Sequence, residues 1–139
     1  MHIRDVIIDY RTDPMGVYTS TGAAHGTASH REGQGTTAYG QASHSEGRYS
    51  VAYGLYSHAE GFSTDAVGDG SHAEGSQTHA VYDYSHAEGS GTLAQGLASH
   101  AEGGEAIAYG DYSHAEGSYF SDFTNDAILL KEQYSPNVN

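Results

Sequence analysis

The sequence contains no cysteine, no tryptophan and only two prolines among its 139 residues. Without cysteine there is no disulfide framework and no thiolate metal site. Only five lysines and arginines stand against 18 acidic residues, so the net charge is −13. Because phosphate backbones and anionic membrane surfaces are bound mainly by Lys and Arg, we expect neither nucleic acid nor such a membrane as a partner.

Long hydrophobic runs are also missing. No apolar segment approaches the roughly 20 residues needed to cross a bilayer, so we expect no membrane insertion. Residues 1–10 (MHIRDVIIDY) lack the charged stretch and long apolar stretch of a secretory signal. Leu, Ile, Val and Phe together number only 19. In a strongly charged chain this composition usually indicates disorder, because little apolar surface can be buried.

A regular internal repeat argues against disorder. Its signature, Ser-His-x-Glu-Gly, starts at Ser29, Ser43, Ser57, Ser71, Ser85, Ser99 and Ser113, always 14 residues apart. Half a period away, an Ala-x-Gly pattern starts at Ala38, Ala52, Ala66, Ala94 and Ala108. The copy at Ala80 lacks the Gly, and Ala24-His25-Gly26 fits one more half-repeat upstream. The basic unit is therefore seven residues long, (Ser/Thr)-x-Ala-x-Gly-x-x, used in two versions.

A period of seven invites comparison with coiled coils, but this pattern is that of strands. Coiled coils need large apolar residues at two of every seven positions. Here the regular positions hold Ser, Ala and Gly, and repeated Gly would destabilise a helix. Small residues alternate with variable ones, which is the period of a β-strand. We predict an all-β, parallel β-solenoid of 14-residue turns, each with two strands of about five residues and two-residue turns.

The small side of each strand is expected to face inward. Stacked coils place equivalent strands about 4.8 Å apart, and only small side chains fit between the two strands of one narrow coil. Ser, Ala and Gly would then line the interior, and the alternate residues would point outward. Gly at each strand end is expected to form the corner, where a positive φ or a close backbone approach excludes a Cβ.

Two residue types stay fixed on one outward face, whereas the other outward face varies widely. Solvent does not require such constancy, but a face that meets identical copies of itself does. A core of Ala and Ser also buries too little apolar area for one chain, and identical surfaces favour cyclic oligomers. We therefore expect the fixed face at an oligomer axis, with imidazoles and carboxylates paired in charge-assisted hydrogen bonds. The axis residues are His30, Glu32, His44, Glu46, His58, Glu60, His72, Glu74, His86, Glu88, His100, Glu102, His114 and Glu116.

The doubled Ser-x-Ala-x-Gly-x-x pattern resembles the head repeat of trimeric autotransporter adhesins of the YadA type, over about residues 21–117. The resemblance implies a left-handed parallel β-roll that forms a homotrimer. In that family the two outward positions at the trimer axis are typically Val and Ile, where this chain has His and Glu. The Ser-His-Ala-Glu-Gly variant is similar to repeats of phage tail-fibre and neck-appendage proteins.

These resemblances imply a structural or adhesive rod. We expect a component of a trimeric phage fibre or appendage that serves host attachment, made in the cytoplasm and located in the virion. The autotransporter's signal and membrane anchor are not visible, which favours this interpretation. The alternatives are the head of a bacterial surface adhesin and a subunit of a self-assembling extracellular filament. A host-surface glycan or protein is the expected external partner.

The repeated Ser, His and acid suggest a hydrolase, but we expect no enzyme. Adjacent residues of a strand point to opposite faces, so Ser and His of one motif cannot form a nucleophile–base pair. No G-x-S-x-G nucleophile elbow is present. We also expect no cofactor and no metal. Three imidazoles around an axis, holding Zn²⁺, Ni²⁺ or an anion, are the less favoured alternative to His–Glu pairing.

Twelve tyrosines stand out in a chain without tryptophan. Tyr39, Tyr53 and Tyr109 occupy the variable outward strand, where aromatic rings can contact sugars or proteins. These three are the candidate surface recognition residues. The tyrosines before the Ser-His pairs are expected to cover seams between subunits.

Three segments are expected. Residues 1–20 lie outside the repeat as a cap or attachment segment, with a strand candidate at 6–8. Residues 21–117 form the β-roll. Residues 118–139 form a cap or neck, with a short helix expected over 127–134.

Overall fold

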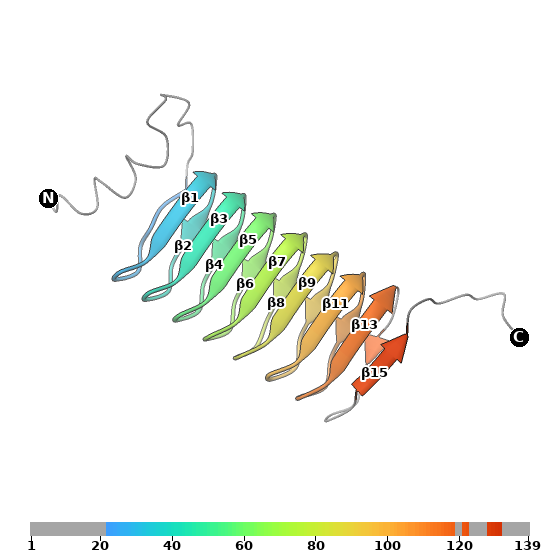
Figure 1. The fold of residues 1–139 in the computed structure, drawn as a ribbon. Coiled ribbons are helices and arrows are strands. Elements are labelled where there is room, and N and C mark those ends of the chain that lie inside the picture. Colours follow the sequence, from blue (N-terminus) through green and yellow to red (C-terminus); the bar gives the residue numbers. More distant parts are fainter. Residues whose placement is uncertain (1–21, 119–120, 123–127, 132–139) are drawn as a thin grey trace, which may run out of the picture.

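The chain folds into a parallel β-solenoid, seen in a computed structural model that describes residues 22–118, 121–122 and 128–131. Figure 1 shows the turns stacked one behind another, with each turn adding one strand to each of two sheets. The first sheet contains β1 (His30–Gln34), β3 (His44–Arg48), β5 (His58–Phe62), β7 (His72–Ser76), β9 (His86–Ser90), β11 (His100–Gly104), β13 (His114–Ser118) and β15 (Ile128–Lys131). The second sheet contains β2 (Thr37–Ala38), β4 (Val51–Ala52), β6 (Asp65–Ala66), β8 (His79–Ala80), β10 (Leu93–Ala94), β12 (Ile107–Ala108) and β14 (Ser121–Asp122).

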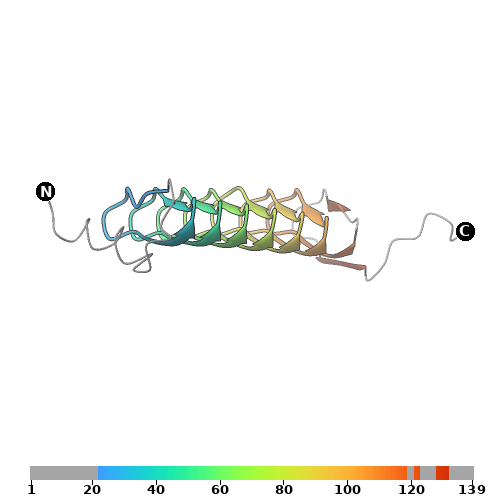
Figure 2. The same ribbon diagram turned by 90° about the horizontal axis from the view of Figure 1, so that it is seen from above.

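Strand pairing follows the sequence repeat. Within each sheet, neighbouring strands are parallel and each residue pairs with the residue 14 positions later, as His58 pairs with His72. The two sheets form opposite walls of flat coils (Figure 2). The predicted parallel solenoid of 14-residue turns, with two strands per turn, is confirmed. The upstream half-repeat is also present, since Ala24 forms a parallel bridge to Ala38.

The two strands of a turn differ in length, which the sequence analysis did not anticipate. Strands of the first sheet have the expected five residues through β13, but those of the second sheet have only two. The hydrogen bonds give the reason. The N–H groups of Tyr53 and Gly54 both donate to the carbonyl of Ala66, at 2.8 and 3.4 Å. Two donors on one carbonyl end the ladder, so the chain turns after Ala52 in this coil and at equivalent places in others.

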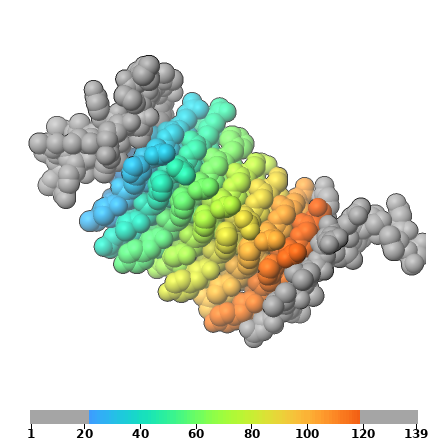
Figure 3. Space-filling model, in the orientation of Figure 1, coloured from blue at the N-terminus to red at the C-terminus, as the bar shows by residue number. Residues whose placement is uncertain are grey.

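The interior consists of the small residues that the alternation predicted to face inward. Among the described residues, every buried hydrophobic side chain is an alanine, such as Ala59 and Ala73, both fully inaccessible to solvent. Columns of Ser and Thr complete this interior. Their hydroxyls are used locally: Ser71 Oγ donates to the carbonyl oxygen of Gly68 at 2.6 Å. The coil is therefore thin, and successive turns form closely packed ridges on its surface (Figure 3).

The expectation that Gly forms the corners is wrong for one of the two Gly columns. Gly61 and its equivalents lie inside the five-residue strands, with φ values between 100° and 115°. A Cβ on Gly61 would meet the carbonyl of Gly75 in the next turn, so close approach also requires Gly there. At the corners, φ is positive mostly at residues with side chains, among them Tyr56 (60°) and Gln77 (58°), and in a few turns at Gly, such as Gly70 (65°).

A buried arginine side chain occupies the interior of the first regular turn. Arg31 stands where most later turns have Ala, and its side chain is fully buried. Its guanidinium donates to Thr36 Oγ1 at 3.3 Å and to the carbonyl oxygens of Gly22 at 3.1 Å and Gly33 at 2.9 Å. This arginine fills the interior near the N-terminal end of the described solenoid. The break in the Ala column was the sequence signal for it.

The solenoid continues beyond Gly117, where the repeat signature ends. Strand β15 pairs in parallel with β13, and its register places Ile128 beside His114 and Leu130 beside Glu116. The helix expected over 127–134 is therefore wrong for residues 128–131, because backbone register prolongs the sheet although the motif is lost. The strand candidate at 6–8 and the cap at 1–20 lie outside the described residues. No helix within the described ranges is long and apolar enough to span a membrane.

Candidate functional site

A column of stacked imidazoles runs along the first sheet. Each long strand of the repeat begins with a His, and the in-register pairing places each ring over the next. From His44 to His100 successive ring centroids lie 4.7–4.8 Å apart, with planes within 10° of parallel. The rings at the two ends depart from this order: His30 meets His44 edge-on, and His114 is tilted by 34°. These seven residues are called the His column below.

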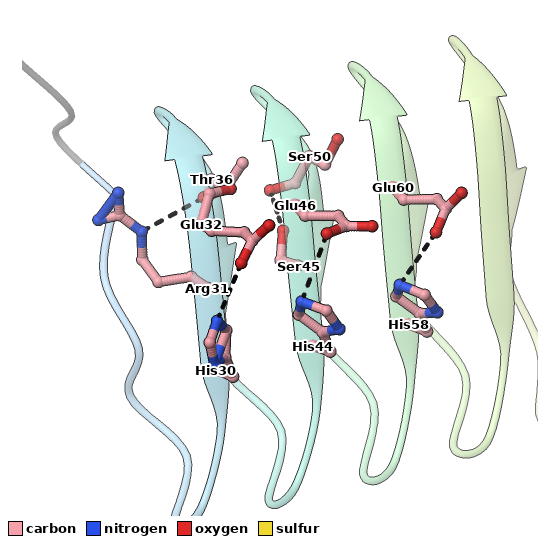
Figure 4. A network of polar contacts seen from close by, with 10 residues as sticks. All are labelled: His30, Arg31, Glu32, Thr36, His44, Ser45, Glu46, Ser50, His58 and Glu60. Carbon is pink, nitrogen blue, oxygen red and sulfur yellow. Dashed lines mark hydrogen bonds and ion pairs between the residues drawn. The ribbon is translucent and has the colours of Figure 1, made fainter. Parts of the chain in front are cut away.

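A column of carboxylates runs beside the imidazoles. Each Glu lies two residues after its His and on the same face of the strand. Nε2 of His58 lies 3.3 Å from Oε2 of Glu60, and most other turns show the same pair at 3.3–3.4 Å. Figure 4 shows three successive pairs side by side on neighbouring strands. The seven glutamates are called the Glu column.

This geometry brings together the residues that the sequence assigned to one face. The sequence predicted His–Glu pairs at an oligomer axis, and in the structure His and Glu lie close together within one turn of one chain. Pairs also form between turns: His100 Nε2 lies 3.4 Å from carboxylate oxygens of both Glu88 and Glu102. The side chains remain about one-third exposed. The position of this face at an oligomer axis stays a prediction.

Several imidazole nitrogens are buried without a hydrogen bond. Within the described residues, the Nε2 atoms in this condition belong to His44, His58, His72, His86 and His114. Glu60 is only 3.3 Å from His58 Nε2, yet the contact does not meet the angular requirement of a hydrogen bond. We regard these contacts as close ion-pair neighbours rather than formed hydrogen bonds. Each of these five nitrogens can therefore still donate or accept a hydrogen bond, or bind another ligand.

The family comparison agrees with this repeat architecture. The model of the YadA head domain repeat matches two stretches, residues 32–57 and 87–113. The chain contains YadA-type head repeats. No curated protein matches the chain. Each matched stretch spans nearly two 14-residue turns, so the family match falls on the repeat that builds the solenoid.

Burial and like neighbours lower the pKa of four imidazoles of the His column in these YadA-type repeats. Burial, followed by the adjacent imidazole, lowers the pKa of His44, His58, His72 and His86. The glutamates oppose this shift but do not cancel it. Burial and neighbouring carboxylates raise the pKa of Glu46. Burial is the largest cause of each shift, and the parallel register adds to it by placing like groups directly beside one another.

The motif serines play a structural part in the YadA-type turns. Ser57 Oγ donates to the carbonyl oxygen of Gly54 at 2.7 Å, and the same bond recurs in other turns. Ser57 is buried, while the adjacent His58 lies on the outer face. The prediction that Ser and His of one motif point to opposite sides is therefore confirmed.

The candidate recognition tyrosines do not form one cluster. The rings of Tyr39 and Tyr53 stack at 5.2 Å, and Tyr39 also stacks on His25 at 4.9 Å. Tyr109 lies four turns further along the same column. Because Tyr39 has a ring against each face, it presents its edge and hydroxyl to solvent. That arrangement suits contact with a protein better than stacking on a sugar.

The second sheet, whose outward residues vary from turn to turn, carries an ion pair that was not expected from the sequence. Nδ1 of His79 lies 3.1 Å from Oδ2 of Asp65 in the preceding turn. This hydrogen bond, with the charge of Asp65, raises the pKa of His79 despite its partial burial. The signal was present in the sequence as opposite charges 14 residues apart.

Proposed function

We propose that this chain is a non-catalytic, adhesin-type structural rod that acts as a homotrimer, with the His and Glu columns at the trimer axis. The observation that carries the proposal is the unbroken, in-register His/Glu face over seven turns. YadA-type head repeats are structural units of adhesins, which supports the adhesin-type role. The axis residues are the fourteen named from the sequence.

The packing of the single chain supports self-association. Its buried hydrophobic side chains in the described part are all Ala, while large side chains such as Tyr84 and Leu55 are exposed. Hydrophobic stabilisation scales with buried apolar area, so a core of methyl groups contributes little for each residue ordered. A second and third copy would cover the imidazoles and carboxylates, which are about one-third exposed in the single chain. Three identical columns around an axis satisfy the cyclic symmetry that such faces favour.

A structural role also agrees with the local chemistry of the repeat. The motif hydroxyl of Ser71 donates to a backbone carbonyl inside the coil, on the side away from His72. An activated nucleophile needs a base within hydrogen-bond reach. The same arrangement recurs in successive turns, so the motif repeats a structural unit along the rod.

We propose a phage fibre or appendage as the assembly that contains the rod, with a location in the virion. The Ser-His-Ala-Glu-Gly form of the repeat supports this setting through its similarity to phage fibre and appendage repeats. The alternative is a bacterial surface adhesin head, and a third is a filament built end to end. In each setting the variable strands and corners are the surface offered to a host glycan or protein.

Molecular mass in solution between pH 4 and pH 8 tests the trimer. At pH 7 light scattering should give the mass of three chains. His58→Ala with Glu60→Ala should lower the thermal stability of the oligomer, whereas Asp65→Ala with His79→Ala on the other sheet should leave its mass unchanged. A monomer at pH 7 refutes the trimer, and an oligomer indifferent to His58→Ala and Glu60→Ala refutes the proposed axis.

Immunogold labelling with antibodies against the repeat tests the setting. Label on fibres of virus particles supports the proposal, and label on bacterial cells supports the alternative. Fibres that lengthen with protein concentration in negative-stain images would support the filament.

A further inference from the structure

We propose that the His and Glu columns bind divalent transition-metal ions, with Zn²⁺ as the representative ion, inside a single chain. Each ion would be held by the His and Glu of one turn and the His of the next turn. This inference goes beyond the proposed function, because it requires neither a second subunit nor a trimer axis.

The ligand atoms already gather in triplets. Five groups of one Glu and two His have their ligand atoms within 4.8 Å of one another. The groups are His30/Glu32/His44, His58/Glu60/His72, His72/Glu74/His86, His86/Glu88/His100 and His100/Glu102/His114. Each group joins two neighbouring strands of the first sheet, so the rigid ladder sets the spacing of its ligands.

The separation of the His and Glu atoms fits a metal better than it fits a hydrogen bond. In the tetrahedral sites that Zn²⁺ prefers, bonds of about 2.0–2.1 Å put neighbouring ligand atoms about 3.3–3.4 Å apart. His58 Nε2 and Glu60 Oε2 are 3.3 Å apart, and so are the same atoms of His72 and Glu74. Both nitrogens are buried and without a hydrogen bond. An ion between nitrogen and carboxylate would satisfy both.

The donor set has the chemistry of a zinc site. Two imidazoles and one carboxylate are a known ligand set for Zn²⁺, with a fourth position for water. Imidazole nitrogen also binds Ni²⁺ and Cu²⁺ well, so the class is a divalent transition metal rather than Ca²⁺, which prefers oxygen. The second imidazole must turn out of the stack toward the ion, since its nitrogen lies up to 4.8 Å from the other ligands. Rotation about its side-chain bonds supplies this movement.

Shared residues limit how many ions bind at once. His72, His86 and His100 each belong to two of the groups. If an imidazole binds one ion, groups that share a His exclude each other, so at most two of the four linked groups fill together. The separate group around Glu32 adds one more. The chain should therefore bind three ions, although five groups exist.

This exclusion makes variants of the same column behave differently. His86→Gln still leaves three compatible groups, those of Glu32, Glu60 and Glu102. His72→Gln leaves only two compatible groups, because the remaining linked groups share His100. The double variant His72→Gln with His100→Gln leaves the group of Glu32 alone. His79→Gln, on the other sheet, is the matched control outside the column.

Calorimetric titration of Zn²⁺ into the full chain, freed of metal with EDTA at pH 7.5, tests the proposal. The expected numbers per chain are three for the parent, three for His86→Gln and for His79→Gln, two for His72→Gln and one for the double variant. Co²⁺ should give the visible spectrum of a tetrahedral ion in the same proportions. Circular dichroism and light scattering of each variant establish that it retains the parent's fold and mass.

The competing arrangement is a ring of three imidazoles from three subunits. In that arrangement His72→Gln and His86→Gln remove equal amounts of metal, which overturns the intrachain site. A parent chain that binds no Zn²⁺ at micromolar concentration also overturns it. If a variant loses its fold, Glu60→Gln with Glu74→Gln replaces it: the two linked groups that remain share His100, so this pair should lower the number from three to two and leave all imidazoles in place. The mass measurement separates this result from the trimer, because the metal count per chain does not depend on the number of chains.

Discussion

The imidazole rings of His72 and His86 lie 4.7 Å apart, with their planes 1° from parallel. This spacing is that of hydrogen-bonded β-strands, so the backbone ladder sets it. Identical side chains in register must therefore meet identical side chains. Each ring shares its burial and its charge environment with the next, and protonation of one ring makes protonation of the next less favourable.

Stability should fall as the pH is lowered from 7.5 to 5.5. The pKa values of His44, His58, His72 and His86 are lowered in the folded chain, below the ordinary value of 6.5. As the pH falls through 6.5, the unfolded chain therefore takes up more protons than the folded chain, and stability decreases. The melting temperature, measured with EDTA present, should drop over this range.

Two groups with raised pKa values reduce the size of this loss of stability. The raised pKa of His79 acts in the opposite direction, but it is one group against four. The raised pKa of Glu46 also favours proton uptake by the folded chain, so it too opposes the loss of stability as the pH falls. His58→Gln with His72→Gln should flatten the dependence, whereas His79→Gln should steepen it. A melting temperature that is constant from pH 7.5 to 5.5 would contradict the burial of the column.

Gly61→Ala should destabilise the chain by several kcal/mol. Its φ of 113° is unfavourable for any residue with a Cβ, and that Cβ would meet the carbonyl of Gly75. Such strain typically costs about 1–3 kcal/mol before the clash is added. Gly104→Ala is the matched control, because the nearest atom to its Cβ would be Ser118 Oγ at 3.5 Å. Urea unfolding should separate the two, and equal losses would disprove the close approach.

Ala73→Val should destabilise the solenoid by about 3 kcal/mol or prevent folding, because overpacking a filled core forces strain. Ala73 is fully buried between the two walls of the coil. Gln95→Val adds a Val at an outward position that already holds Val67 and Val81 in other turns. The control should fold with near-parent stability in thermal melts. A tolerated Ala73→Val would mean that the coil is wider than its alanines indicate.

Arg31→Ala should loosen the first turn without affecting the middle of the rod. The variant loses the guanidinium bonds to Thr36 and the two carbonyls, each worth about 1–3 kcal/mol when the remaining partner stays buried. Repeat solenoids are stabilised between nearest neighbours, so the damage stays local. Hydrogen exchange should accelerate at Ala38 but not at Ala94. Arg48→Ala, whose guanidinium lies over the Tyr49 ring, should change neither.

The predictable features are those encoded by period and residue size. The interval of 14 fixed the coil, and the Ser/Ala/Gly alternation identified the interior that Ala59 and Ala73 occupy. The constancy of His and Glu located the candidate site on one face. Each of these depends only on which residues repeat and how large they are, and a parallel register converts that repeat directly into columns.

Other features depend on hydrogen bonding between turns. The sharing of the Ala66 carbonyl by two N–H groups shortens the second strands. The positive φ of Tyr56 and Gln77 is imposed by corners that the adjacent turns hold in place. Strand β15 follows the sheet edge offered by β13 although its residues break the motif. Local residue preferences do not predict these outcomes, and some of them favour a different conformation.

By itself, the sequence determined that this protein is a stack of 14-residue coils with a small-residue interior and a His/Glu face. Only the tertiary structure decided how that face is used within one chain. It stacked the imidazoles at the strand spacing and left nitrogens such as His72 Nε2 without hydrogen bonds. It also gathered His and Glu into triplets across turns. Composition and period specify which groups share a face, but distances and angles between groups arise only when the backbone ladder fixes each turn on the next.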